Sequence, residues 1–176
     1  HANSNATSSR VRHSGANTVV TEVGTNGTWT YPTGSVQRVV FNGGAANDSF
    51  DAAGSNLPVL AKGNGGNDQL IGGNARDTLV GAAGIDTLSG GAEDDTLVTI
   101  DTRTDDTANG GPGRDTYWRD AVNGSYDSAS VTADDFELVV GVVTVRHLLG
   151  KGGFVEARII KTDGAGVNRR VYRPAM

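Results

Sequence analysis

Seven aspartates recur at a regular spacing in the middle of the chain, and their carboxylates are the side chains best placed to do chemistry. They form two series with steps of 18 or 20 residues: Asp48, Asp68, Asp86 and Asp106, and Asp77, Asp95 and Asp115. If the chain coils once per step, neighbours in a series lie about 4.8 Å apart and repel each other by roughly 3 kcal/mol per pair. A divalent cation between them reverses that sign. Calcium fits because it takes 6–8 oxygen ligands with loose geometry.

A metal-free alternative exists for each aspartate taken singly. Aspartate is common in glycine-rich turns because its side chain bonds nearby backbone N–H groups. The regular recurrence in two series is what favours the cation.

The elements that must position these carboxylates are four consecutive nonapeptides from Gly63 to Val98, which read GNGGNDQLI, GGNARDTLV, GAAGIDTLS and GGAEDDTLV. Each begins with glycine and has aspartate at position six and leucine at position eight. A glycine-rich half reverses the chain, and the three residues after it form a short strand with one inward leucine. Two nonapeptides therefore make one coil, and stacked coils form two parallel sheets around the leucines Leu70, Leu79, Leu88 and Leu97.

Two further copies flank the central four. They are GGAANDSFD at residues 43–51 and GGPGRDTYW at residues 110–118, each separated from the centre by eleven residues that we interpret as bulged turns of the same coil. The usual glycine at position four is replaced by Ala46, Ala75 and Glu93 in three copies. A left-handed conformation there costs on the order of 1 kcal/mol, so we expect some sites to be weak.

The pattern G-G-x-G-x-D-x-U-x resembles the hemolysin-type, or RTX, calcium-binding repeat. The resemblance implies an all-β fold, a right-handed parallel β-roll (solenoid) capped by short antiparallel strands at both ends. It also implies several calcium ions, about two to five, each held between coils by position-six aspartates and turn carbonyls. The pairs it favours are Asp68 with Asp86 and Asp77 with Asp95. The candidate ligands are the seven aspartates and the turn glycines Gly63, Gly65, Gly72, Gly81 and Gly90.

The segments outside the repeats divide the chain further. We expect a lead or linker without regular structure at 1–16, an N-terminal β cap at 17–41, the roll at 42–118 and a C-terminal antiparallel β cap at 119–176. Trp29 and Tyr31 lie two residues apart on one strand face. They are expected to pack inside the N-terminal cap, with a sugar-stacking platform as the alternative. The same expectation holds for Tyr117 and Trp118.

Composition limits the function classes. Among 176 residues there are 26 glycines, a net charge of −5 and no cysteine, which excludes a disulfide scaffold and thiolate metal sites. No apolar run approaches the ~20 residues that span a bilayer, and no nucleophile or zinc motif is present. The sequence thus predicts a non-catalytic, calcium-binding structural module of a secreted or surface protein, extracellular and without a nucleic-acid partner. The alternatives are an adhesin or glycan-binding domain that contacts polysaccharide, and an accessory module of a secreted hydrolase linked to a parent domain.

Overall fold

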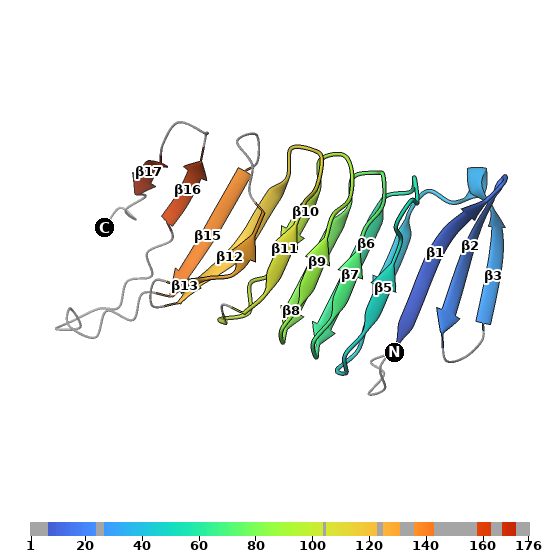
Figure 1. Cartoon of the computed structure of the whole chain (residues 1–176), viewed down its shortest axis with the longest axis horizontal. Helices are drawn as coiled ribbons and strands as arrows, with labels where there is room; N and C mark the ends of the chain where they lie inside the picture. The colour runs from blue at the N-terminus through green and yellow to red at the C-terminus, as the bar shows by residue number, and fades with distance from the viewer. Residues whose placement is uncertain are drawn as a thin grey trace, which may run out of the picture.

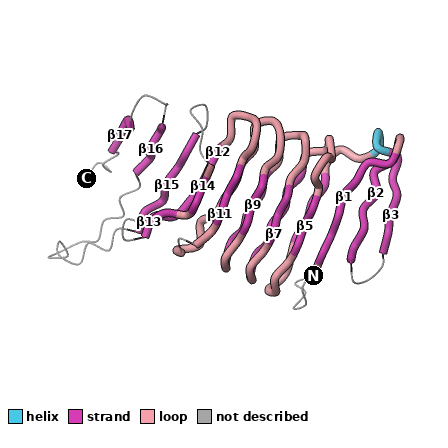
Figure 2. Tube along the Cα trace, viewed as in Figure 1, coloured by secondary structure: helices cyan, strands magenta, loops and turns pink. Residues whose placement is uncertain are grey.

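The protein is a two-sheet β-solenoid in a computed structural model that describes residues 7–23, 27–103, 105–122, 125–130, 136–142, 158–162 and 167–171. Within these ranges the only helical element is the single 3₁₀ turn η1 (Thr33–Ser35). No helix in the described part of the chain has the length and apolar character needed to cross a membrane. The all-β prediction is confirmed, because short strands alternate with turns along the whole repeat region (Figure 1, Figure 2).

The first sheet, called sheet A here, contains eight strands. Its repeat strands are parallel to one another, whereas three strands at its N-terminal end form an antiparallel meander. In spatial order sheet A consists of β14 (Ser128–Ala129), β11 (Thr107–Asn109), β9 (Thr87–Ser89), β7 (Gln69–Ile71), β5 (Ser49–Asp51), β1 (Ser8–Ser14), β2 (Asn17–Val23) and β3 (Gly27–Pro32).

The second sheet, sheet B, lies across the core from sheet A and contains the alternate repeat strands. In spatial order it consists of β17 (Val167–Val171), β16 (Arg158–Thr162), β15 (Phe136–Val142), β12 (Thr116–Val122), β10 (Thr96–Val98), β8 (Thr78–Ala83), β6 (Val59–Gly65) and β4 (Val39–Asn42), with β13 (Ser125–Tyr126) paired to β12.

The core is a thin double row of apolar side chains, one from each repeat strand. In sheet A the row runs in register through Phe50, Leu70, Leu88, Ala108 and Ala129. In sheet B it runs through Phe41, Ala61, Leu79, Leu97 and Tyr117. The four repeat leucines are at most 1% exposed, and each contributes about 1.5–3 kcal/mol by its burial. Position eight therefore closes the roll, as the sequence predicts.

The N-terminal end differs from the sequence prediction. Residues 8–14, expected to lack regular structure, form β1, which pairs in parallel with β5 and extends sheet A by one more position. Residues 1–6 of the expected lead lie outside the described residues. Because sheet B ends at β4, strands β2 and β3 continue sheet A past the last strand of sheet B (Figure 1).

The aromatic residues at the two ends follow the prediction only in part. Trp29 and Tyr31 of β3 are 43% and 45% exposed, so the expectation that both pack inside a cap is wrong. They extend from a sheet edge instead of covering the end of the core. At the other end Tyr117 is buried as expected, whereas its neighbour Trp118 points outward, because adjacent residues of a strand face opposite sides.

The C-terminal end includes the strands β15, β16 and β17, which continue sheet B. The sequence predicts an antiparallel meander there, and β15, β16 and β17 do pair in antiparallel order. However, β15 also pairs in parallel with β12 from Thr116 to Val122. The first strand of the expected cap thus continues the solenoid sheet (Figure 2). Residues 143–157 lie outside the described residues.

Candidate calcium-binding edges

Each position-six aspartate directly precedes a short repeat strand, so the strand register fixes where its carboxylate lies. Asp68 precedes β7 and Asp86 precedes β9, and these two strands pair with Gln69 opposite Thr87. The tight turns fold the carboxylates inward, and all seven side chains are buried, at 1–3% exposure: Asp48, Asp68, Asp77, Asp86, Asp95, Asp106 and Asp115. Buried carboxylates need compensation for the loss of water.

The seven aspartates stack in two columns, one along each edge of the solenoid. In every adjacent pair, the Oδ1 atom of the later aspartate accepts the backbone N–H of the earlier one. The donor–acceptor distances in the first column are 2.7 Å for Asp48 to Asp68, 2.8 Å for Asp68 to Asp86 and 2.7 Å for Asp86 to Asp106. In the second column they are 2.8 Å for Asp77 to Asp95 and 2.9 Å for Asp95 to Asp115.

The spacing of 18 and 20 residues therefore does place the predicted residues side by side. The direct contact between neighbours is a hydrogen bond from backbone to carboxylate. One oxygen of each carboxylate is thus used by the fold itself, as the metal-free alternative requires, and the function of the other oxygen decides what the edge can bind.

The hydrogen bonding of the second carboxylate oxygen, Oδ2, differs among the aspartates. In Asp48 and Asp77 it accepts the backbone N–H of Gly44 and Gly73, each at 2.5 Å. In four others it is buried without a hydrogen-bond partner: Asp68, Asp86, Asp95 and Asp106. Burying a carboxylate oxygen without a hydrogen-bond donor costs free energy. A cation or a donating group beside these four oxygens would offset that cost.

The position-one glycines provide the space beside these oxygens. A Cβ on Gly63, Gly72, Gly81 or Gly90 would collide with Oδ2 of the aspartate five residues later. Carbonyl oxygens of the following coil reach the same places: a Cβ on Gly63 would lie 2.8 Å from the Gly81 carbonyl, and one on Gly90 would lie 2.8 Å from the Gly110 carbonyl. Carboxylate and carbonyl oxygens therefore converge where only glycine fits. Gly65 differs, because a Cβ there would make ordinary contacts of 3.6 Å or more.

The carboxylates are strongly perturbed as titrating groups. Burial raises the pKa of Asp68 to about 6, with further contributions from the charges of Asp86 and Asp48. Burial likewise raises the pKa of Asp95 to about 7, helped by Asp77 and Asp115. For Asp106, burial and the neighbouring charges Asp127 and Asp86 raise the pKa to about 7.

The raised pKa values have one physical meaning. In the absence of a cation, the folded edge disfavours ionised carboxylates. A bound cation would reverse this preference.

The oxygen atoms at these edges suit calcium when the turn carbonyls are counted together with the carboxylates. Within the described ranges no three His, Asp or Glu side chains cluster tightly enough to hold a metal by themselves. Calcium accepts backbone carbonyls together with carboxylates, at 2.3–2.6 Å and in variable number. The converging Oδ2 and carbonyl oxygens at the glycine positions supply that mixture, which magnesium, with its stricter octahedral geometry, matches less well.

The position-four prediction is partly wrong. Of the three substituted positions, only Glu93 has a left-handed backbone, with φ of 73°, and Ala46 and Ala75 do not. Strain appears instead at Asn64 and Ala82, which occupy position two with φ of 78° and 76°. Both of these copies keep a glycine at position four, Gly66 and Gly84, so the strain follows from the loss of the position-two glycine.

One functional position escaped the sequence analysis. Asp127 continues the first column, because its Oδ1 accepts the N–H of Asp106 at 3.4 Å. Its Oδ2 accepts the Thr99 hydroxyl at 2.7 Å and the Asp120 N–H at 3.0 Å, so donors from the protein satisfy this last carboxylate. The signal in the sequence was the similarity of Asp-Ser-Ala at 127–129 to Asp-Thr-Ala at 106–108, although no glycine pair precedes either site.

Comparisons with known proteins agree with this geometry. Residues 62–97 match the RTX calcium-binding nonapeptide repeat, in four copies. No curated protein and no solved structure matches the chain. The match coincides with the segment in which Oδ2 atoms converge with turn carbonyls. The central segment of the chain, residues 62–97, therefore carries four copies of the RTX calcium-binding nonapeptide repeat.

Proposed function

We propose that this chain is a structural module that completes its folding when calcium binds along the two edges of the roll. The observation that carries the proposal is the set of buried Oδ2 atoms without donors at Asp68, Asp86, Asp95 and Asp106. Ionised and unpaired, these groups destabilise the folded chain. A cation that binds only the folded state contributes its binding free energy to folding.

The residues that would hold calcium are the stacked aspartates and the carbonyls of the adjoining turns. Asp68 with Asp86 and Asp77 with Asp95 remain the central pairs, with Asp48, Asp106 and Asp115 at the outer coils. Turn carbonyls near Gly63, Gly72, Gly81 and Gly90 complete the coordination. We expect about two to five ions per chain, because calcium needs 6–8 oxygens and each coil edge offers only a few.

The proposal includes a location and a role. RTX repeats are typical of secreted proteins, and an extracellular setting provides calcium at the concentrations that weak, multi-ion sites require. We therefore place the module outside the cell or on its surface, as a structural part of a larger protein rather than a catalytic one. The roll at 42–118 would be the calcium-dependent part, between an N-terminal and a C-terminal β cap.

Circular dichroism on the intact chain tests this proposal. In chelator we expect reduced β-structure, which increases when calcium is added to millimolar concentration. Magnesium at the same concentration is the control and should produce a much smaller change. An identical spectrum in chelator and in calcium, with the same thermal midpoint, would refute folding on calcium.

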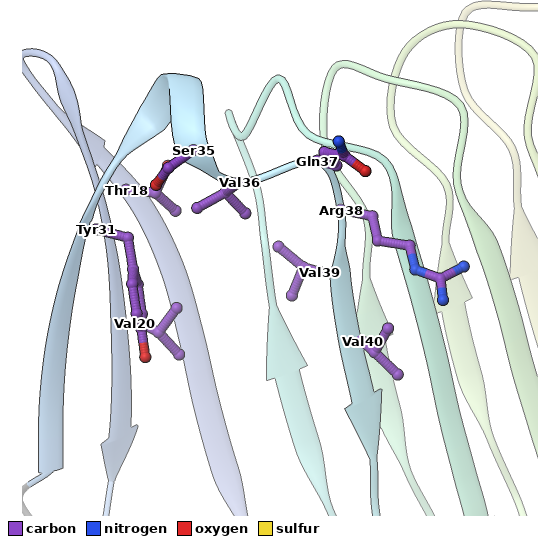
Figure 3. A pocket seen from close by; sticks show the side chains of 9 residues that line it. All are labelled: Thr18, Val20, Tyr31, Ser35, Val36, Gln37, Arg38, Val39 and Val40. Carbon is purple, nitrogen blue, oxygen red and sulfur yellow. The ribbon is translucent and has the colours of Figure 1, made fainter.

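A second candidate function rests on the N-terminal end. Trp29 and Tyr31 are large, exposed and on the same strand face, as required of a platform on which sugar rings stack. Beside Tyr31 lies an open groove of about 510 Å³, lined also by Val20, Gln37 and Arg38 (Figure 3). Gln37 and Arg38 offer donors that could bond sugar hydroxyls. Under this candidate the roll serves as the stalk of a glycan-binding domain.

The glycan candidate has its own experiment. Binding of the chain to an array of polysaccharides should be lost in Trp29→Ala and kept in Trp118→Ala, an exposed tryptophan at the other end of the solenoid. Absence of binding to every polysaccharide, or equal loss in both variants, would exclude Trp29 as a sugar platform.

A further inference from the structure

A second set of side chains links neighbouring coils, one position before the aspartate columns. At position five, the Oδ1 atom of Asn47 accepts the backbone N–H of Asn67 at 2.8 Å. Oδ1 of Asn67 in turn accepts the N–H of Ile85 at 3.0 Å. On the other edge, Oδ1 of Asp94 accepts the N–H of Arg114 at 3.1 Å. These three residues, Asn47, Asn67 and Asp94, form the position-five ladder.

The position-five ladder runs opposite to the aspartate columns. A position-six carboxylate accepts from the coil before it, as Asp68 does from Asp48. A position-five oxygen accepts from the coil after it, as Asn47 does from Asn67. Where both are present, adjacent turns are joined by two side-chain bonds of opposite direction, which fixes their register without any metal.

The ladder is interrupted at two joints. On the second edge Arg76 also offers no acceptor, but its guanidinium forms an ion pair with Asp94 of the next coil at 3.0 Å. On the first edge the position-five residue is isoleucine, which cannot form such a pair.

Ile85 occupies position five between Asn67 and Asp105, and its aliphatic side chain offers no acceptor to the next coil. The side chain is 44% exposed. The step from 85 to 105 is 20 residues, the same as from Asn47 to Asn67, where the bond forms. Asp105 instead forms an exposed ion pair with Arg103. The position-five bond is therefore absent because residue 85 is isoleucine, and not because the two coils are spaced differently.

We propose that the position-five oxygens are metal-independent positioning groups that hold adjacent calcium turns in register, and that the joint between Ile85 and Asp105 is the one most dependent on calcium. The second part rests on the proposed calcium function; the first does not. The same joint contains Asp86 and Asp106, both with an unpartnered Oδ2. It therefore combines a missing position-five bond with two carboxylates that need a cation.

Hydrogen exchange of single amides tests the ladder directly. In chelator, the N–H groups of Asn67, Ile85 and Arg114 should exchange more slowly than that of Asp105, and Asn67→Leu should selectively accelerate Ile85. Asn67→Asp, which keeps Oδ1, should restore much of the protection. Equal exchange at residues 85 and 105, or no change in Asn67→Leu, would overturn the positioning role whether or not calcium binds.

A gain-of-bond variant tests the weak joint. Ile85→Asn places an acceptor where Asn47 has one, and Ile85→Leu is the matched control without an oxygen. Ile85→Asn should lower the calcium midpoint for folding about two- to tenfold relative to Ile85→Leu, the range of one net hydrogen bond. Identical midpoints in the two variants would overturn the assignment. If the chain is folded without calcium, the same comparison is made by urea unfolding, and equal stability of the two variants counts against it.

Discussion

Replacing Asp95 with asparagine should affect folding and calcium binding in opposite directions. Asp95 is 1% exposed, its Oδ1 accepts the Asp77 N–H at 2.8 Å, and its Oδ2 has no hydrogen-bond partner. Asparagine keeps the Oδ1 acceptor and replaces Oδ2 with an NH2 group. The Gly110 carbonyl and Oδ2 both lie within 2.8 Å of the point that a Cβ on Gly90 would occupy, so we expect that NH2 group to find an acceptor there.

The magnitude follows from the pKa of Asp95. Burial, together with the nearby charges of Asp77 and Asp115, raises this pKa from 3.8 to about 7. A group with a raised folded-state pKa contributes its stability below the unfolded value of 3.8 and loses it as pH rises through about 7. Moving the pKa that far corresponds to about 4 kcal/mol in a rigid, dry site, and to about 1–2 kcal/mol at the higher effective dielectric of relaxed proteins.

Urea unfolding in chelator, followed by circular dichroism, measures the first effect. At pH 8, Asp95→Asn should be about 1–2 kcal/mol more stable than the unsubstituted protein, and at pH 5 the difference should fall to roughly a third of that. Calcium titration measures the second effect, and the variant should need more calcium to fold. Asp105→Asn, at an exposed carboxylate, is the control and should leave stability almost unchanged.

The reasoning fails if Asp95→Asn is less stable than the unsubstituted protein in chelator at pH 8. That outcome would mean that the ionised carboxylate stabilises the calcium-free fold. The account of a cation compensating buried, unpaired charge would then be wrong for this position.

Three further predictions concern the core, the turns and pH. Leu79→Ala should destabilise the folded protein by about 2–5 kcal/mol in urea unfolding, because Leu79 is fully buried, whereas Val40→Ala, at an exposed position, should stay within about 0.5 kcal/mol. Gly72→Ala should cost about 1–3 kcal/mol and weaken calcium binding, because its Cβ would collide with the Gly90 carbonyl, while Gly34→Ala, with open space around it, should change neither. Calcium affinity measured by calorimetry should fall as pH drops from 8 to 5, because Asp95 and Asp106, with pKa values of about 7, then take up protons; a pH-independent affinity would contradict this.

The repeat region could be predicted because three positions of the nine-residue unit recur with the same residue type. Glycine, aspartate and leucine at positions one, six and eight predict the turn, the edge and the core, and the two-residue insertions before Asp68 and Asp106 leave the columns in register. The hydrogen bonds within the columns could not be predicted. Which carboxylate oxygen meets a backbone N–H depends on coil-to-coil geometry that the nine-residue pattern does not specify.

The ends of the chain were harder to predict because no repeat governs them. Residues 8–14 are polar except for Val11, whose side chain is fully buried in the core. Strand β1 forms there because the open edge of β5 offers backbone partners, with Thr7 adding two bonds to Asp48 Oδ1. Trp29 and Tyr31 remain exposed because the N-terminal strands extend sheet A and do not fold over the core. Tertiary pairing decided both outcomes.

The calcium content of the purified chain tests the central claim most directly. After equilibrium dialysis against millimolar calcium, elemental analysis should find about two to five ions per chain. The count should fall when Asp86, Asp95 and Asp106 are replaced together by asparagine. A chain that retains no calcium, or the same number of ions after the triple substitution, would contradict the account.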